Sequence, residues 1–93
     1  MPKLVFTHSY EKRAEKFLLR HPELRGQYVK TLQLLEMNLH HPSLRLHRLK
    51  GKLSDLHSVF INTGYRITME FIVREDTIVP VNVGNHAAVY ENR

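Results

Sequence analysis

The chain has 93 residues, no cysteine, and 14 lysines and arginines against nine acidic residues, which gives a formal net charge of +5 with histidine neutral. This length supports one hydrophobic core, so we expect a single domain over residues 1–93, and the lack of cysteine excludes disulfides and thiolate metal sites. No apolar run approaches the roughly 18 residues that cross a bilayer, and the first residues lack the apolar stretch of a secretory signal, so we expect a cytoplasmic protein.

The first half of the chain predicts a strand and two helices. Residues 3–6 (KLVF) are a short strand signal. Ser9 is a suitable N-cap for a helix over residues 9–20, whose apolar side chains recur on one face. A second helix begins at Pro22, because proline is tolerated in a first helical turn, and its apolar residues keep helical spacing until Pro42. Two amphipathic helices therefore form a hairpin.

From residue 56 onward the pattern changes to extended, β-branched runs, which predict three consecutive antiparallel strands at residues 56–62, 65–73 and 77–84. Asn62 to Gly64 predict a tight hairpin turn whose glycine takes a positive φ. Pro80 cannot donate to a strand ladder, so it marks an edge or a bulge.

These elements predict an α+β fold of order β-α-α-β-β-β with a short C-terminal segment. The helical hairpin covers one face of an antiparallel sheet, and the opposite face is expected in solvent. Arg66 alternates with the apolar residues Tyr65 and Ile67, so its side chain points to that opposite face.

The positive charge is concentrated in one segment. Residues 37–54 contain no acidic residue, while four cations fall between positions 45 and 52: Arg45, Arg48, Lys50 and Lys52. Such a block favours binding to phosphate, and we predict that these residues grip an RNA backbone. A solubility face is the alternative.

Three short motifs occur in order along the chain: LKG at residues 49–51, TGYRI at residues 63–67 and VGNHAAVY at residues 83–90. On these motifs the whole chain resembles the RelE/ParE superfamily of bacterial toxins from type II toxin–antitoxin pairs, and its ending is similar to the RelE and YafQ type of messenger-RNA interferase. The resemblance implies a microbial RNase-like fold and metal-independent cleavage of messenger RNA in the ribosomal A site, without a cofactor. It also implies a cognate antitoxin protein that holds the toxin inactive.

The resemblance assigns roles to four further residues. Arg66 stands at the arginine of a strand motif that lies at the active-site surface in RelE-like members. His86 stands at the catalytic histidine of YafQ-like members, and His47 at another histidine of that site. Tyr90 takes the place of the terminal aromatic, where it suits stacking on a base. The remaining aromatic residues at apolar spacings are expected in the core: Phe17, Tyr28, Phe60 and Phe71.

Cleavage through the 2′-OH needs a base, an acid for the leaving oxygen, and cations for the crowded phosphate. Histidine suits both proton transfers because it titrates near neutral pH. We therefore expect His86 as general acid, His47 as possible base and Arg66 as the phosphate-binding fork. Each also has a plainer reading, since His86 could close the terminal segment, Arg66 could pair with Glu70, and a lone loop histidine is often inert.

Two other functions stay open at this point. The YafQ pattern has a histidine and an acid where this chain has Phe60 and Gly64. The chain could therefore be a ParE-like gyrase inhibitor without nuclease activity, or a non-catalytic member that binds only its antitoxin or RNA. The presence of His86 and Arg66 at matching positions argues for the nuclease.

Overall fold

The structure is a computed structural model that describes residues 2–91, with the side chains of residues 73, 88, 90 and 91 outside that description. Its helices and strands follow one another in this order: β1 (Lys3–Leu4), α1 (His8–Arg20), α2 (Arg25–Met37), β2 (His47–Arg48), β3 (His57–Phe60), β4 (Tyr65–Ile72), β5 (Thr77–Asn85) and α3 (His86–Glu91). Short 3-10 turns lie at Pro22–Leu24, Pro42–Leu44, Gly51–Leu53 and Val73–Glu75. Within residues 2–91, no helix is both long and apolar enough to cross a bilayer.

The strands form one five-stranded sheet in the order β1-β5-β4-β3-β2. Strands β2 to β5 pair antiparallel with their neighbours, which confirms the predicted α+β class and the three consecutive strands. Strand β1 differs, because it runs parallel to β5 through Lys3 opposite Thr77 and Leu4 opposite Ile78. Strand β2 is an addition that the sequence pattern did not predict.

Both predicted helices are present, with corrected starts. Helix α1 is capped by Thr7, whose hydroxyl oxygen accepts a hydrogen bond from the Tyr10 N–H at 3.1 Å, whereas Ser9 lies inside the helix. The second helix starts later than predicted, because Pro22 opens a 3-10 turn and α2 begins at Arg25. Threonine at position 7 meets the same chemical requirement as the predicted serine, so the error is one of register.

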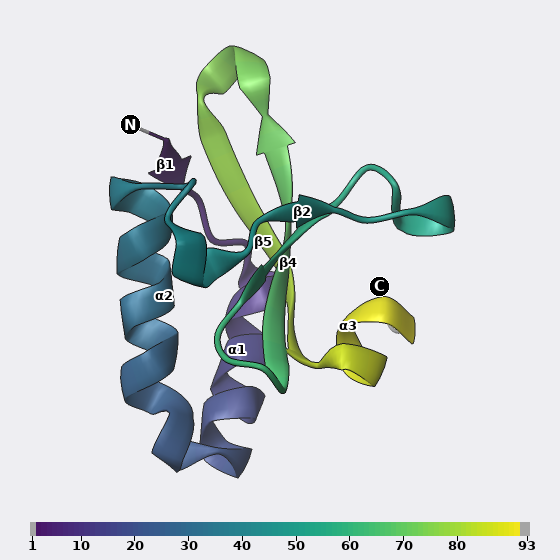
Figure 1. Ribbon diagram of the computed structural model, residues 1–93. Helices are drawn as coiled ribbons and strands as arrows, with labels where there is room; N and C mark the ends of the chain where they lie inside the picture. Colours follow the sequence, from purple (N-terminus) through teal and green to yellow (C-terminus); the bar gives the residue numbers. More distant parts are fainter. Residues whose placement is uncertain (1, 92–93) are drawn as a thin grey trace.

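The main core lies between this helical hairpin and one face of the sheet (Figure 1). The predicted helical faces are buried there, and on the sheet side Ile67 and Met69 are fully buried against them. The hydroxyls of Tyr10 and Tyr28 lie 2.9 Å apart in a hydrogen bond. Burial raises the pKa of both tyrosines, so they stay neutral in the folded protein.

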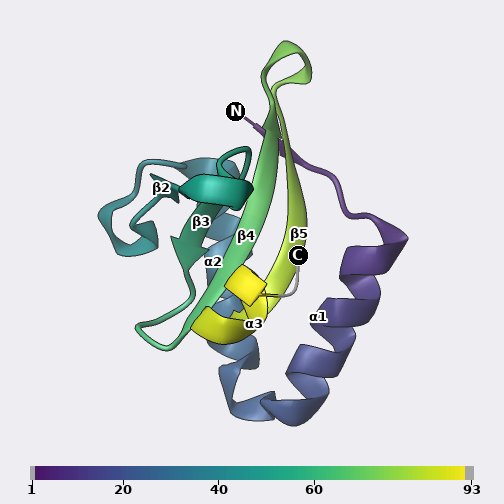
Figure 2. The same cartoon turned by 90° about the vertical axis from the view of Figure 1, so that its right-hand side faces the viewer.

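The opposite face of the sheet is not simply in solvent, contrary to the prediction. Helix α3 crosses in front of β4 and β5 on the side away from α1 and α2 (Figure 2). The apolar side chains of Leu49, Leu56 and Val89 are buried outside the main core. Ser58 and Thr68 are also fully buried, and their hydroxyl oxygens have no hydrogen-bond partner within the described residues. A thin second layer therefore covers part of this face.

Two irregular positions shape the sheet, one in the β3–β4 turn and one within β5. In the β3–β4 turn the Asn62 side-chain oxygen accepts from the N–H groups of Gly64 (2.8 Å) and Tyr65 (3.0 Å). This side-chain turn makes a positive φ unnecessary, and Gly64 does not adopt one, so that part of the prediction was wrong. Pro80 is next to a β-bulge, because Met69 pairs with Pro80 while the preceding Thr68 pairs with Asn82. Of the two predicted alternatives at Pro80, an edge or a bulge, the structure shows the bulge.

Candidate functional site

Three of the predicted site residues surround the ring of Phe60. Arg66 pairs with Phe60 across β3 and β4, and its guanidinium carbon lies 4.3 Å from the ring centroid. The guanidinium carbon of Arg45 lies 5.4 Å from the same centroid, and the His47 ring approaches edge-on at 6.3 Å between centroids. Phe60 is half-buried and outside the main core, so its assignment to the core was wrong. It is a platform for cations.

The sheet explains why these residues meet. Arg66 follows Tyr65 and precedes Ile67, and Ile67 is buried in the main core, so Arg66 points to the face that carries α3. Strand β2 adds His47 to the same sheet by pairing it with Ser58. Because Ser58 and Phe60 are two residues apart on one strand, their side chains share this face.

The ring of His47 has a defined tautomer. Its Nδ1 lies 2.9 Å from the carbonyl oxygen of Arg45, and a carbonyl can only accept, so Nδ1 carries the proton in that contact. The lone pair of the neutral ring is therefore on Nε2. An exposed histidine in this state can take up a proton at Nε2.

His86 belongs to a second group of residues on the same side of the sheet. It is exposed, it is the first residue of α3, and it lines a hollow of about 370 Å³ together with Lys50, Lys52 and two leucines. The 3-10 turn Gly51–Leu53 and the preceding Lys50 deliver the two lysines to this hollow. The predicted general acid and two of the predicted RNA-binding cations thus lie together.

The two groups are linked by the end of β5. Arg66 pairs with Gly84, and His86 follows Gly84 by two residues. Arg66, which is predicted to bind phosphate, and His86, which opens α3, are therefore carried by neighbouring backbone segments. Together the two groups contain both kinds of chemistry that RNA cleavage needs, which are titratable imidazoles and fixed positive charge.

Two predicted residues are not brought into these groups. The Arg48 Nε donates to the Ser54 carbonyl at 2.7 Å, and Arg48 follows His47 on a strand, so the two side chains leave opposite faces. Tyr90 lies in α3, but its side chain is outside the described part of the structure, so its predicted stacking role stays a prediction.

Comparison with known proteins identifies the fold. No family model and no curated protein matches the sequence. Among solved structures, YafQ from E. coli strain BL21(DE3) superposes with a TM-score of 0.78 at 14% identity, covering 97% of this chain and 99% of YafQ. YafQ in the E. coli DinJ–YafQ complex gives 0.76 at 13% identity (97% and 99%), and a YoeB/ParE toxin from Agrobacterium tumefaciens gives 0.69 at 16% identity (90% and 98%). The chain has the RelE/ParE-like toxin fold.

Within this toxin fold, His57 is a titratable residue that sequence reasoning gave no role. It pairs with Arg48 across β2 and β3, and its ring meets Phe71 edge-on with the centroids 4.5 Å apart. Burial lowers the pKa of His57, and the nearby Arg48 and His47 lower it further. His57 therefore favours its neutral form beside the basic segment.

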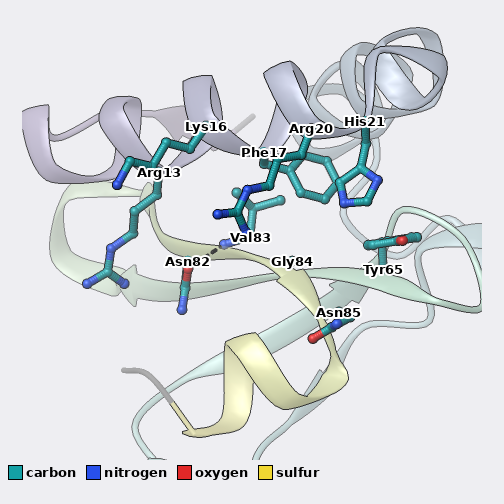
Figure 3. Close-up of a pocket in the computed structure, with 10 residues that line it drawn as sticks. All are labelled: Arg13, Lys16, Phe17, Arg20, His21, Tyr65, Asn82, Val83, Gly84 and Asn85. Atoms are coloured by element: carbon teal, nitrogen blue, oxygen red, sulfur yellow. Dashed lines mark hydrogen bonds between the residues drawn. The ribbon is translucent and has the colours of Figure 1, made fainter.

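Another hollow of this toxin fold lies elsewhere, between α1 and β5 (Figure 3). Its volume is about 450 Å³, and Arg13, Lys16 and Arg20 of α1 line one side while residues 82–85 of β5 line the other. Sequence reasoning missed this groove because the cations of α1 have the ordinary pattern of a solvent-facing helix side. Only the tertiary packing of α1 beside β5 reveals it.

Proposed function

We propose that this protein is the toxin of a type II toxin–antitoxin pair and acts in the cytoplasm as a ribosome-dependent messenger-RNA endoribonuclease. The observation that carries the proposal is the arrangement of Arg45, His47 and Arg66 about Phe60, linked through the end of β5 to His86 and its lysines. The shared fold with YafQ, which is found in complex with DinJ, supports both the toxin assignment and a protein antitoxin.

In the proposed reaction, the RNA 2′-OH attacks the adjacent phosphorus and the 5′-oxygen leaves, so one fragment ends in a 2′,3′-cyclic phosphate and the other begins with a 5′-hydroxyl. His47 takes the 2′-OH proton at Nε2, the position that its contact with Arg45 leaves unprotonated. Arg66 binds the phosphate, whose charge increases as five oxygens crowd around phosphorus. His86 protonates the leaving oxygen, and Lys50 and Lys52 hold the RNA on the far side of the scissile bond.

Phe60 contributes to this reaction by holding the guanidinium groups. A guanidinium stacked on an aromatic ring keeps its N–H fork available at the edge, so it binds phosphate without first losing side-chain freedom. In this proposal Phe60 orients the cations, and His47 and His86 carry out the proton transfers.

The decisive experiment is primer extension on translated messages after brief expression of the toxin. His86→Ala and Arg66→Ala should each reduce cleavage by about a hundredfold or more, because each removes a group that acts in the transition state. Circular dichroism should show both variants folded. His40→Ala is the matched control, since His40 is exposed and lies in the turn that follows α2. Undiminished cleavage in both site variants would exclude the proposal.

A gyrase inhibitor without nuclease activity is the second candidate, favoured by the single fact that position 60 holds an aromatic residue that cannot transfer protons. It predicts supercoiling defects, intact messages and no effect of His86→Ala. A non-catalytic binding protein would instead cause no growth arrest when it is expressed alone. The same primer-extension experiment, read with growth curves, separates the three functions.

A further inference from the structure

Arg45 has an unusual backbone conformation. Its φ and ψ are 48° and 47°, which is the left-handed region that side chains other than those of asparagine and aspartate rarely adopt. Asp76, in the turn before β5, is another residue with a positive φ. A residue keeps such a conformation where its surroundings hold it there, and residues of this kind cluster at functional sites.

The chain is anchored on both sides of Arg45. Leu44 is buried in the main core, and Leu46 is partly buried against the same core. The Arg45 N–H donates to the Pro42 carbonyl at 3.2 Å, which closes the 3-10 turn before it. Strand β2 begins two residues later, at His47. The chain must therefore change direction at residue 45, between two leucines that the core holds in place.

The left-handed conformation aims the Arg45 carbonyl at the His47 ring. The ψ angle of a residue sets the direction of its own carbonyl group, and the observed 47° lies about 90° from the ψ of both a right-handed helix and a strand. With the chain anchored on both sides, either of those conformations would turn the carbonyl away from the His47 Nδ1. The 2.9 Å contact between these two atoms therefore depends on the left-handed backbone.

This contact decides which ring nitrogen of His47 has the free lone pair. A neutral histidine ring in water carries its proton mostly on Nε2, whereas a carbonyl acceptor beside Nδ1 holds the proton on Nδ1. A base that acts through Nε2 needs that nitrogen unprotonated. The Arg45 carbonyl therefore selects the tautomer that the proposed reaction uses, against the preference of the isolated ring.

We propose that Arg45 is a positioning residue, whose left-handed backbone fixes His47 as the tautomer protonated on Nδ1. The Arg45 guanidinium, 5.4 Å from the centroid of the Phe60 ring, makes a separate contribution to the site. The proposal rests on the proposed function in one respect, because the tautomer affects cleavage only if His47 is the base. The tautomer itself is a property of the folded chain and is measured without RNA.

The first measurement is a long-range ¹H–¹⁵N correlation spectrum of the full chain labelled with ¹⁵N. It is recorded at a pH of about 9, above the range in which imidazole titrates. An unprotonated ring nitrogen resonates far downfield of a protonated one, so each ring reports its tautomer. His47→Gln identifies the signals of His47 among the seven histidines by removing them. The unprotonated nitrogen of His47 should be Nε2, and a ring protonated on Nε2 would overturn the proposal.

Two variants of Arg45 separate its backbone from its side chain. Arg45→Gly and Arg45→Val both remove the guanidinium, but glycine adopts a positive φ freely whereas a β-branched side chain strongly disfavours it. Arg45→Gly should keep the ring of His47 protonated on Nδ1, while in Arg45→Val the form protonated on Nε2 should predominate. Primer extension should then show about tenfold less cleavage in Arg45→Val than in Arg45→Gly.

Asp76→Val is the matched control, because it places the same residue at another exposed position with a positive φ. It should leave the His47 tautomer and the cleavage rate unchanged. The same tautomer in Arg45→Gly and Arg45→Val, or an equal change of the His47 signals in Asp76→Val, would overturn the proposal.

Two further outcomes are decided by the same spectra. If circular dichroism shows that Arg45→Val does not fold, the unsubstituted chain and Arg45→Gly still test the proposal, since a ring protonated on Nε2 in either of them contradicts it. If the toxin cleaves no RNA, the nuclease proposal fails, while the tautomers of His47 in the Arg45 variants still support or contradict the role of the backbone.

Discussion

The two faces of the sheet are built differently. The face toward α1 and α2 is a thick apolar layer in which Leu35, Ile67 and Met69 are fully buried. The face toward α3 carries a thin cover over buried hydroxyls, and beside it lie the cations around Phe60 and the hollow of His86. One face holds the fold together, while the other presents charged groups that a close-packed core would exclude.

The largest expected effect tests the helix-covered face. Leu35→Ala should lower the free energy of unfolding by about 2–5 kcal/mol, because it removes a fully buried side chain and leaves a cavity. Urea denaturation measures the loss. Below its unfolding transition, the variant should still cleave RNA at close to the normal rate. A strong loss of cleavage in folded Leu35→Ala would mean that the helix-covered face contributes to activity as well as to stability.

The next effect tests the site face. Phe60→Leu should reduce cleavage about tenfold, because the guanidinium groups of Arg45 and Arg66 lose their aromatic platform. Phe60→Tyr should retain activity, since the ring is kept. Phe71→Leu is the matched control: Phe71 is also half-buried, but its ring contact is with His57. Equal losses in Phe60→Leu and Phe71→Leu, measured on folded protein, would assign a purely structural role to Phe60.

The sequence predicted the helix-covered face well, because the patterns that define this face lie within short stretches of the chain. Apolar residues at helical spacing identified α1 and α2, and alternation in β4 separated Ile67 from Arg66. The errors there were small shifts at helix starts, where Thr7 replaced Ser9 as the cap. Such shifts follow from the similar capping ability of serine and threonine.

The site face was harder to predict, because it depends on contacts between residues distant in sequence. Phe60 has the apolar spacing of a core residue, and only the pairing of β3 with β4 shows it beneath Arg66. The cover by α3 was missed for the same reason. The site residues themselves came from short motifs, and their assembly into one reaction remains a proposal.

A smaller effect concerns the buried hydroxyl of Thr68. Thr68→Val should raise the free energy of unfolding by about 1 kcal/mol, because it replaces a buried hydroxyl that has no partner within the described residues by a methyl group. Thr31→Val is the matched variant on the helix-covered face. The Thr31 hydroxyl donates to the Gln27 carbonyl at 2.8 Å, so its removal should lower stability by about 1 kcal/mol. Urea denaturation of both variants tests this contrast. A loss of stability in Thr68→Val together with a gain in Thr31→Val would refute it.

The smallest effect is a pH dependence of stability, in which His57 governs the acid side and Tyr10 the alkaline side. The pKa of His57 is lowered in the fold, mainly by burial, so folding favours its neutral form. The stability associated with His57 is therefore present above its unfolded pKa of about 6.5 and is lost as the pH falls toward its lower folded pKa. Tyr10 acts in the other direction: its pKa is raised by burial, so the associated stability is lost as the pH rises above about 10.

Urea midpoints measured between pH 5 and pH 11 can separate the two residues. His57→Gln should flatten only the acid side of the profile, and Tyr10→Phe only the alkaline side. His40→Gln, at an exposed histidine outside both faces, should leave both sides unchanged. If His57→Gln left the acid slope intact, another group would be responsible for it, and the neutral state of His57 beside Arg48 would no longer account for the acid side of the profile.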